Sequence, residues 1–174
     1  IFLYQVAHVD TVKNSYNTFE NNEISGFGYG IVSLGIGPLI NRATLEYDRY
    51  YNVENKIQGN LIYNVERSGI FLGFEENTIA KQNRIYNTKA TKTDKTFGIE
   101  MGIETETTPL RFGYNNVGII LDGNEISDVQ ASKLVAGISA FQDGQLYPSV
   151  QGGQEFFPNT NENFKFYNNI ITRL

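Results

Sequence analysis

Residues 77–87 read NTIAKQNRIYN, a stretch in which two Asn-x-Ile triplets follow each other closely. The same triplet recurs at 22–24, 55–57 and 124–126. An aliphatic residue at a fixed offset from an asparagine is typical of an internal repeat, and a repeat determines the whole fold. The recurring asparagine is therefore the feature from which the fold can be predicted.

Aligning the chain on this asparagine gives five units, FENNEI (19–24), VENKI (53–57), IAKQNRI (79–85), LDGNEI (121–126) and FYNNI (166–170). A second segment that begins with Gly-Ile follows four of them, GIVSL (30–34), GIFLG (69–73), GIEMG (98–102) and GISAF (137–141). Short segments bounded by Gly and Asn are typical of strands, and the uneven spacing of the units argues against helical repeats. The sequence therefore predicts a stack of short strands with loops of variable length at its corners.

The asparagine has a physical reason in such a stack. Asn tolerates the left-handed backbone of a sharp corner, and its amide can hydrogen-bond an Asn in the next layer, about 4.8 Å away. The Ile two positions later points into the core. We expect one column made of Asn22, Asn55, Asn83, Asn124 and Asn168.

Asn-x-Ile followed by Gly-Ile-x-Leu resembles the repeat of right-handed parallel β-helix proteins of the pectate-lyase-like class, from about residue 16 to residue 174. The resemblance implies an all-β fold, a right-handed parallel β-helix (solenoid) of about five coils with long corner loops. The class includes polysaccharide lyases, glycoside hydrolases, epimerases, phage tailspikes and bacterial adhesins. It therefore implies an extracellular or cell-surface protein of bacterial or phage origin that meets a polysaccharide or surface glycan. Fold alone does not settle activity.

Composition excludes several classes of protein. The chain has 174 residues, which fits a single domain spanning 1–174. The net charge of −5 argues against nucleic acid as a partner, and no apolar run is long enough to span a membrane. Because the chain begins IFLYQVAHVD and ends inside a strand-like NNIITRL, we expect a fragment of a longer chain. Its open ends should then meet neighbouring coils or other protein chains.

Alternation along the Gly-Ile segments predicts which side chains face the core. The expected inward residues are Ile31, Ile70, Ile99 and Ile138, with Leu72, Met101 and Ala140 two positions on. The expected outward residues are Val32, Phe71, Glu100 and Ser139. In the Asn-x-Ile segments the expected outward column is Glu23, Lys56, Arg84, Glu125 and Asn169. Its pairs Glu23–Lys56 and Arg84–Glu125 have opposite charge, and we interpret this column as solvated surface.

The loops that interrupt the repeat are better candidates for a site. Long excursions at 35–52, 104–116 and 142–163 leave after Gly-Ile segments, whereas the second coil has only FEEN at 74–77. The excursions of coils one and three, 35–52 and 104–116, should wall a groove above coil two whose floor holds Phe74, Glu75 and Glu76. Aromatic rings stack on sugars and Arg binds hydroxyls or carboxylates. The expected substrate-binding residues are Tyr47, Tyr50, Tyr51, Phe74, Arg111 and Tyr114. The alternative is that the aromatics of LEYDRYY (45–51) pack against the body of the coil.

Two functions follow from this groove. The first is a non-catalytic β-helix that binds glycan or serves as a structural or adhesive surface element. The second is a secreted polysaccharide-degrading enzyme, a lyase before a hydrolase. A lyase needs a base beside a cation, and a hydrolase needs two carboxylates about 5–5.5 or 6.5–9.5 Å apart. The candidate catalytic residues are Glu75, Glu76, Asp48 and Arg49.

No metal site or cofactor is expected. His8, the only histidine, stands two residues before Asp10, and a structural role is favoured for this pair. Glu104, Glu106 and Asp122 offer the oxygen ligands that calcium takes, but their spacing matches no calcium-loop signature. Calcium therefore stays an open alternative.

Overall fold

The structure is a computed structural model, and it describes residues 1–4, 13–41, 46–102, 115–141, 145–148, 154–157 and 161–174. Every helix or strand in these ranges is a β-strand, so the described part of the chain is all-β. It follows that no helix able to span a membrane occurs there.

Fifteen of the strands form three parallel sheets of five. Sheet A contains β1 (Phe2–Tyr4), β4 (Tyr29–Leu34), β10 (Ser68–Gly73), β14 (Lys95–Met101) and β17 (Leu134–Ala140). Sheet B contains β2 (Thr18–Glu20), β8 (Lys56–Gln58), β12 (Ile79–Lys81), β15 (Ile120–Asp122) and β20 (Lys165–Tyr167). Sheet C contains β3 (Glu23–Ser25), β9 (Leu61–Tyr63), β13 (Arg84–Lys89), β16 (Glu125–Gln130) and β21 (Ile170–Thr172).

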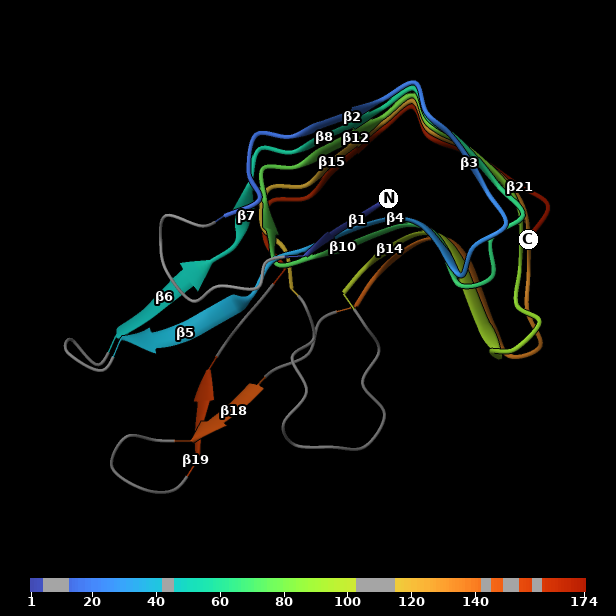
Figure 1. The fold of residues 1–174 in the computed structure, drawn as a ribbon. Coiled ribbons are helices and arrows are strands. Elements are labelled where there is room, and N and C mark those ends of the chain that lie inside the picture. Colours follow the sequence, from blue (N-terminus) through green and yellow to red (C-terminus); the bar gives the residue numbers. More distant parts are fainter. Residues whose placement is uncertain (5–12, 42–45, 103–114, 142–144, 149–153, 158–160) are drawn as a thin grey trace.

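The chain visits the three sheets in the same order on every pass, from A to B to C and back to A. Each pass lays its strands beside those of the previous pass, and the sheets form three sides around one interior (Figure 1). Short strands β7 (Asn52–Val53) and β11 (Glu75–Glu76) pair at the corner between sheets A and B. The predicted stack of short parallel strands is therefore present.

Two antiparallel hairpins leave the stack between a sheet A strand and the next sheet B strand. One is β5 (Gly37–Asn41) with β6 (Glu46–Tyr50), and the other is β18 (Gln145–Pro148) with β19 (Gln154–Phe157). Both lie away from the three sheets in Figure 1. They fall within two of the excursions that the sequence predicts, at 35–52 and 142–163.

The interior is a single apolar cluster to which all three sheets contribute. The predicted inward column of sheet A is confirmed, because Ile70 lies in register with Ile31 and Ile99, and all three are fully buried. Ile138 continues the column and packs on the cluster while partly exposed. Ala140 was predicted to be inside but is exposed, since β17 is the edge strand of sheet A among the described residues.

The outer face of sheet A differs from the prediction. Val32, Phe71 and Glu100 occupy the expected outward positions, yet their exposed fractions are 5%, 4% and 0%. Phe71 packs edge-on against Tyr29 with ring centroids 6.2 Å apart. The outer face of sheet A is therefore buried at these positions of β4, β10 and β14, whereas the fourth predicted outward residue, Ser139 in β17, is partly exposed.

The asparagine column exists, but two of its five members were predicted wrongly. Backbone N–H and side-chain amide groups donate in series from Asn22 to Asn60, Asn83, Asn124 and Asn169, over distances of 2.9–3.1 Å. The Nδ2 groups of the last four also donate to a backbone carbonyl, on Phe19, Ile57, Ala80 and Leu121, at 2.9 Å. We call each asparagine of this column a rung. The side-chain amide of each internal rung thus has hydrogen-bond partners for both its oxygen and its nitrogen, as a buried amide must.

Asn55 and Asn168 lie outside this column for different reasons. Asn55 precedes β8 of sheet B, where it accepts a hydrogen bond from the N–H of Asn17 at 2.9 Å. Asn168 is one residue out of register and adopts a left-handed backbone with φ of 52°. A shift of one residue turns a strand over. Accordingly Ile171 pairs with Ile126 in the core column, while Ile170 lies in the outward column and is 57% exposed.

The left-handed corner falls on the residue before each rung, not on the rung itself as predicted. These residues are Asn21, Gly59, Gln82, Gly123 and Asn168, with φ between 52° and 63°. Since the rung residue keeps a normal backbone, its side chain can point along the stack instead of out of the corner.

Candidate functional site

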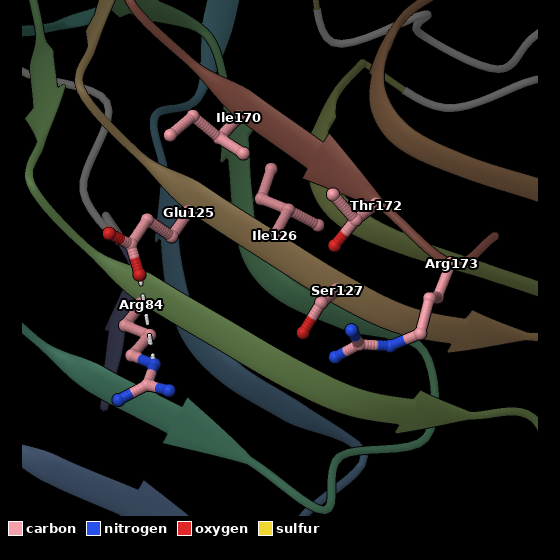
Figure 2. A pocket seen from close by; sticks show the side chains of 7 residues that line it. All are labelled: Arg84, Glu125, Ile126, Ser127, Ile170, Thr172 and Arg173. Atoms are coloured by element: carbon pink, nitrogen blue, oxygen red, sulfur yellow. Dashed lines mark ion pairs between the residues drawn. The ribbon is translucent and has the colours of Figure 1, made fainter.

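The candidate site is a hollow of about 170 Å³ on the outer face of sheet C, at β16 and β21 (Figure 2). The residues that line it are Arg84, Glu125, Ile126, Ser127, Ile170, Thr172 and Arg173. Sheet register explains why they meet: Glu125 lies beside Arg84 and Ile170, and Ser127 lies beside Thr172. The hollow thus combines two guanidinium groups, two hydroxyls, a carboxylate and an exposed isoleucine.

Arg84 and Glu125 were predicted as an opposite-charge pair in an outward column, and the pair is present. Arg84 Nε lies 3.8 Å from Glu125 Oε2, and both side chains are more than half exposed (Figure 2). The other predicted pair, Glu23–Lys56, is wrong. Lys56 lies in sheet B beside Thr18 and Ile79, whereas Glu23 lies in sheet C beside Leu61.

Two tyrosines continue the same face toward the first coils. The rings of Tyr63 and Tyr86 are stacked, with centroids 5.1 Å apart and planes 7° from parallel. Tyr63 donates its hydroxyl hydrogen bond to Glu23 at 2.7 Å, and this bond raises the pKa of Tyr63. The Arg84 guanidinium lies 5.7 Å from the Tyr86 ring centroid. Because Tyr86 lies beside Ser127 in register, the aromatic stack borders the residues of the hollow.

At the other side of the hollow, Arg173 holds Asp128 through two hydrogen bonds, from Nε at 2.5 Å and from Nη2 at 2.7 Å. The guanidinium lowers the pKa of the Asp128 carboxyl, which also accepts a hydrogen bond from Ser127. Both residues have left-handed backbones, with φ of 55° for Asp128 and 51° for Arg173. This fixes Arg173 at the rim, where it extends along β16 toward Ser127 (Figure 2).

Three residues of the predicted groove are buried. Tyr51 and Phe74 are 0% and 1% exposed, and their ring centroids lie 5.5 Å apart. Glu75 is also fully buried. This arrangement matches the alternative in which aromatics pack against the body of the coil. The floor of a groove would need exposed side chains, and of the three residues predicted there only Glu76 is partly exposed.

The Glu75 carboxylate is enclosed by four neutral donors. Oε1 accepts from Ser33 Oγ and Asn52 Nδ2, both at 2.7 Å, and Oε2 accepts from Thr78 Oγ1 at 2.6 Å and Asn55 Nδ2 at 3.1 Å. Burial raises the pKa of Glu75 to about 7, although the four hydrogen bonds act in the opposite direction. Since no surface reaches this carboxylate, we assign it a structural role.

A second buried acid, Glu100, lies on the outer face of sheet A. It forms an ion pair with Arg67 at 2.6 Å and accepts a hydrogen bond from Ser68. Arg67 also stacks over Phe97, with its guanidinium carbon 4.7 Å from the ring centroid. Burial nevertheless dominates and raises the pKa of Glu100. The sequence predicts Glu100 on open surface. Arg67 and Ser68, which come before the Gly-Ile segment of the previous coil, were the signal that could have identified its partners.

The remaining predicted site residues are only partly described. Tyr47, Asp48 and Arg49 lie in β6, and Tyr50 ends that strand and is partly buried. Arg111 and Tyr114 lie outside the described residues, as do His8, Asp10, Glu104 and Glu106. The predicted groove wall at 104–116 and the lyase alternative therefore stay predictions.

The described residues contain no cluster of three or more His, Asp or Glu side chains able to hold a metal ion. Asp122, one of the residues considered for calcium, instead accepts a hydrogen bond from Asn168 Nδ2 at 3.1 Å. Comparison with protein-family models, curated proteins and solved structures finds no match to this chain. Function must therefore be argued from the site itself.

Proposed function

We propose that the chain forms a right-handed parallel β-helix in an extracellular or cell-surface protein, and that the outer face of sheet C binds a glycan. The observation that carries this proposal is the hollow between Arg84 and Arg173, with hydroxyls at its base and a tyrosine stack beside it. The order of the sheets and the asparagine column support the β-helix part of the proposal.

The chemistry of the face suits a sugar more than an apolar ligand. Arg84 and Arg173 can donate to hydroxyl or carboxylate oxygens, and Ser127 and Thr172 can donate or accept. The edge of Tyr86 and the exposed Ile170 provide apolar contact for the C–H side of a ring. At about 170 Å³ the hollow is smaller than the usual pocket for a drug-sized molecule, so it fits one sugar unit of a longer chain.

The decisive experiment is binding of the chain to a panel of neutral and acidic glycans, with variants that fill or strip the hollow. Thr172→Leu fills it, and Arg84→Met removes one guanidinium while keeping the length of the side chain. We expect each to weaken binding at least tenfold. Lys56→Ala, on the exposed face of sheet B, is the matched control and should bind as the parent does. Equal glycan binding by the parent and all variants would contradict the proposed site.

The open ends of the sheets support a structural or adhesive role as part of the same proposal. Phe166 and Ile171 occupy core positions of the last coil, yet they are 48% and 41% exposed. The equivalent Ile24 in the first coil is 7% exposed. We propose that neighbouring coils or protein chains cover this end, since apolar sheet ends favour pairing.

A further inference from the structure

One corner of the stack carries a carboxylate where its neighbours carry amides. Asn52 and Glu75 are paired in β7 and β11, and the backbone N–H of Glu75 donates to Asn116 Oδ1 at 2.9 Å. Asn14 and Asn161 extend the same series, bonding to Asn52 and Asn116 respectively. Glu75 is therefore the one acid in a column of asparagines, within the part of the chain that the structure describes.

The partners of Glu75 lie on both sides of the hairpin β5–β6. Ser33 is near the end of β4, just before the hairpin leaves, and Asn52 begins β7, just after it returns. Both donate to the same oxygen, Oε1, at 2.7 Å. The other oxygen binds Asn55 and Thr78, which belong to the corner itself. One side chain thus fastens the two stems of the hairpin to each other and to the corner.

The backbone around Glu75 packs tightly on the same stems. The N–H of Gly35 donates to Gly73 O at 2.9 Å, and the N–H of Asn52 donates to Phe74 O at 3.0 Å. A Cβ at Gly35 would lie 2.5 Å from Phe74 O, so only glycine fits there. The base of the hairpin is therefore held by residues 73–75, and a change at Glu75 acts directly on it.

All four hydrogen bonds to the Glu75 carboxylate come from neutral donors. The charged residues on the described segments around this corner are Lys13, Glu54, Lys56, Glu76 and Glu162. Glu54 and Lys56 are exposed, the other three are partly exposed, and none is among the four donors. A buried carboxylate without a cation favours its protonated form. The hydroxyls of Ser33 and Thr78 can rotate to accept from the acid, because a hydroxyl both donates and accepts.

We propose that Glu75 is a proton-linked clamp: its protonated carboxyl holds the two stems of hairpin β5–β6 on the corner, and loss of the proton loosens them. The hairpin carries Tyr47, Asp48 and Arg49 in β6, so the clamp governs a segment distinct from the hollow on sheet C. Because the pKa of Glu75 is raised to about 7, the loosening falls between the ordinary value of 4.5 and about 7.

The test is hydrogen exchange by mass spectrometry on the full chain, at steps from pH 4.5 to pH 8.5, with Glu75→Gln compared at each pH. Comparison at equal pH cancels the intrinsic pH dependence of exchange. In the parent, protection of peptides covering 33–41 and 46–52 should fall at least tenfold between pH 4.5 and 7 and then level off. In Glu75→Gln it should not change with pH.

Two further variants keep the test decisive. Glu76→Gln, one residue away and partly exposed, should follow the parent profile. Ser33→Ala removes one donor to the ionised form, so the fall in protection should extend to higher pH. The Ser33→Ala variant also tests the proposal if Glu75→Gln fails to fold. The same pH profile in the parent and Glu75→Gln, or no shift in Ser33→Ala, would overturn the clamp.

Discussion

Gly69 lies against Ile85 so closely that a Cβ added to it would meet Ile85 Cγ2 at 2.5 Å and the carbonyl oxygen of Gly98 at 2.7 Å. Gly30, Gly98 and Gly137 face Ile62, Ile126 and Ile171 in the same way. The glycine of the Gly-Ile motif is thus the position where sheet A approaches the isoleucines of sheet C.

Gly69→Ala should therefore destabilise the protein by about 3 kcal/mol, because the added methyl meets a backbone oxygen that cannot move away. Chemical denaturation followed by circular dichroism measures this change. Gly28→Ala is the control, since a Cβ there meets nothing within 4 Å. It should change stability by less than about 0.5 kcal/mol. A similar effect of both substitutions would contradict the packing role of the glycine column.

Internal and terminal rungs of the asparagine column should differ in their contribution to stability. Asn83→Ala removes the acceptor for the N–H and Nδ2 groups of Asn60 and the Nδ2 donor to Ile57 O, whereas Asn124 Oδ1 keeps the backbone N–H of residue 83 as a donor. At about 1–3 kcal/mol for each unpaired group, the loss should exceed about 3 kcal/mol. Asn22→Ala removes only the Nδ2 donor to Asn60 Oδ1, which keeps the backbone N–H of residue 22, and it should lose about 1 kcal/mol. Equal losses in thermal unfolding would show that the column is not cooperative.

The stability of the chain should depend on pH through Glu75. The folded pKa, about 7, is above the ordinary value of 4.5, so the folded state binds the proton more tightly than the unfolded state. This contribution is fully present below pH 4.5 and is lost as pH rises toward 7, amounting to about 3 kcal/mol. Denaturant midpoints of the parent and Glu75→Gln are measured from pH 4.5 to 8. The midpoint of the parent should fall relative to that of Glu75→Gln as the pH rises, because glutamine does not titrate. Parallel curves would contradict the assigned pKa.

The buried pair Arg67–Glu100 and the exposed pair Arg84–Glu125 offer a matched comparison of ion pairs. Glu100→Gln leaves the mostly buried Arg67 charge without its partner and should destabilise the protein by about 3–5 kcal/mol. Glu125→Gln should lose less than about 1 kcal/mol, because both side chains of that pair are in water and 3.8 Å apart. Double-mutant cycles at low and high salt separate the two, since only the exposed pair should respond strongly to salt.

Association through the last coil is tested by charging its exposed core. Ile171→Lys and Phe166→Lys place a cation at positions that are 41% and 48% exposed. If this end pairs with other chains, sedimentation velocity should show less self-association for both variants than for the parent. Phe27→Lys is the control, because Phe27 is 63% exposed and lies in the loop between β3 and β4. Identical sedimentation of parent and variants would exclude this contact.

The stack of short parallel strands was predictable because both motifs report steric needs that repeat each time the chain passes through the three sheets. Gly-Ile marks a close approach of two sheets, and Asn-x-Ile marks a rung followed by a core residue. The register was less predictable. Asn60-Leu61-Ile62 and Asn169-Ile170-Ile171 also fit the triplet. A left-handed residue precedes Asn60 and Asn169, but Glu54 before Asn55 is left-handed too, with φ of 56°, so backbone conformation does not separate Asn60 from Asn55. A Gly or Asn directly before the rung, as at Gly59, Gly123 and Asn168, was the available signal.

The site was less predictable than the fold, because burial on the outer side of a sheet depends on what covers it. Phe74 and Glu75 follow a sheet A strand, where an excursion was expected to leave them open, but the stems of the hairpin close over them. The hollow on sheet C arises from small side chains, Ser127 and Thr172, set between arginines from different coils. Such a combination involves residues about 45 positions apart and gives no local pattern in the sequence.

The asparagine column also has a direction. Every rung donates toward the last coil and accepts from the first, from Asn22 to Asn169. The two faces of the stack are therefore chemically unlike: one presents the Oδ1 of Asn22 and the other the N–H of Asn169. A layer added to either face can extend the series only in the same sense, so face-to-face pairing of like ends would set acceptor against acceptor or donor against donor. The amides thus fix the direction in which any further layer of strands can add to this protein.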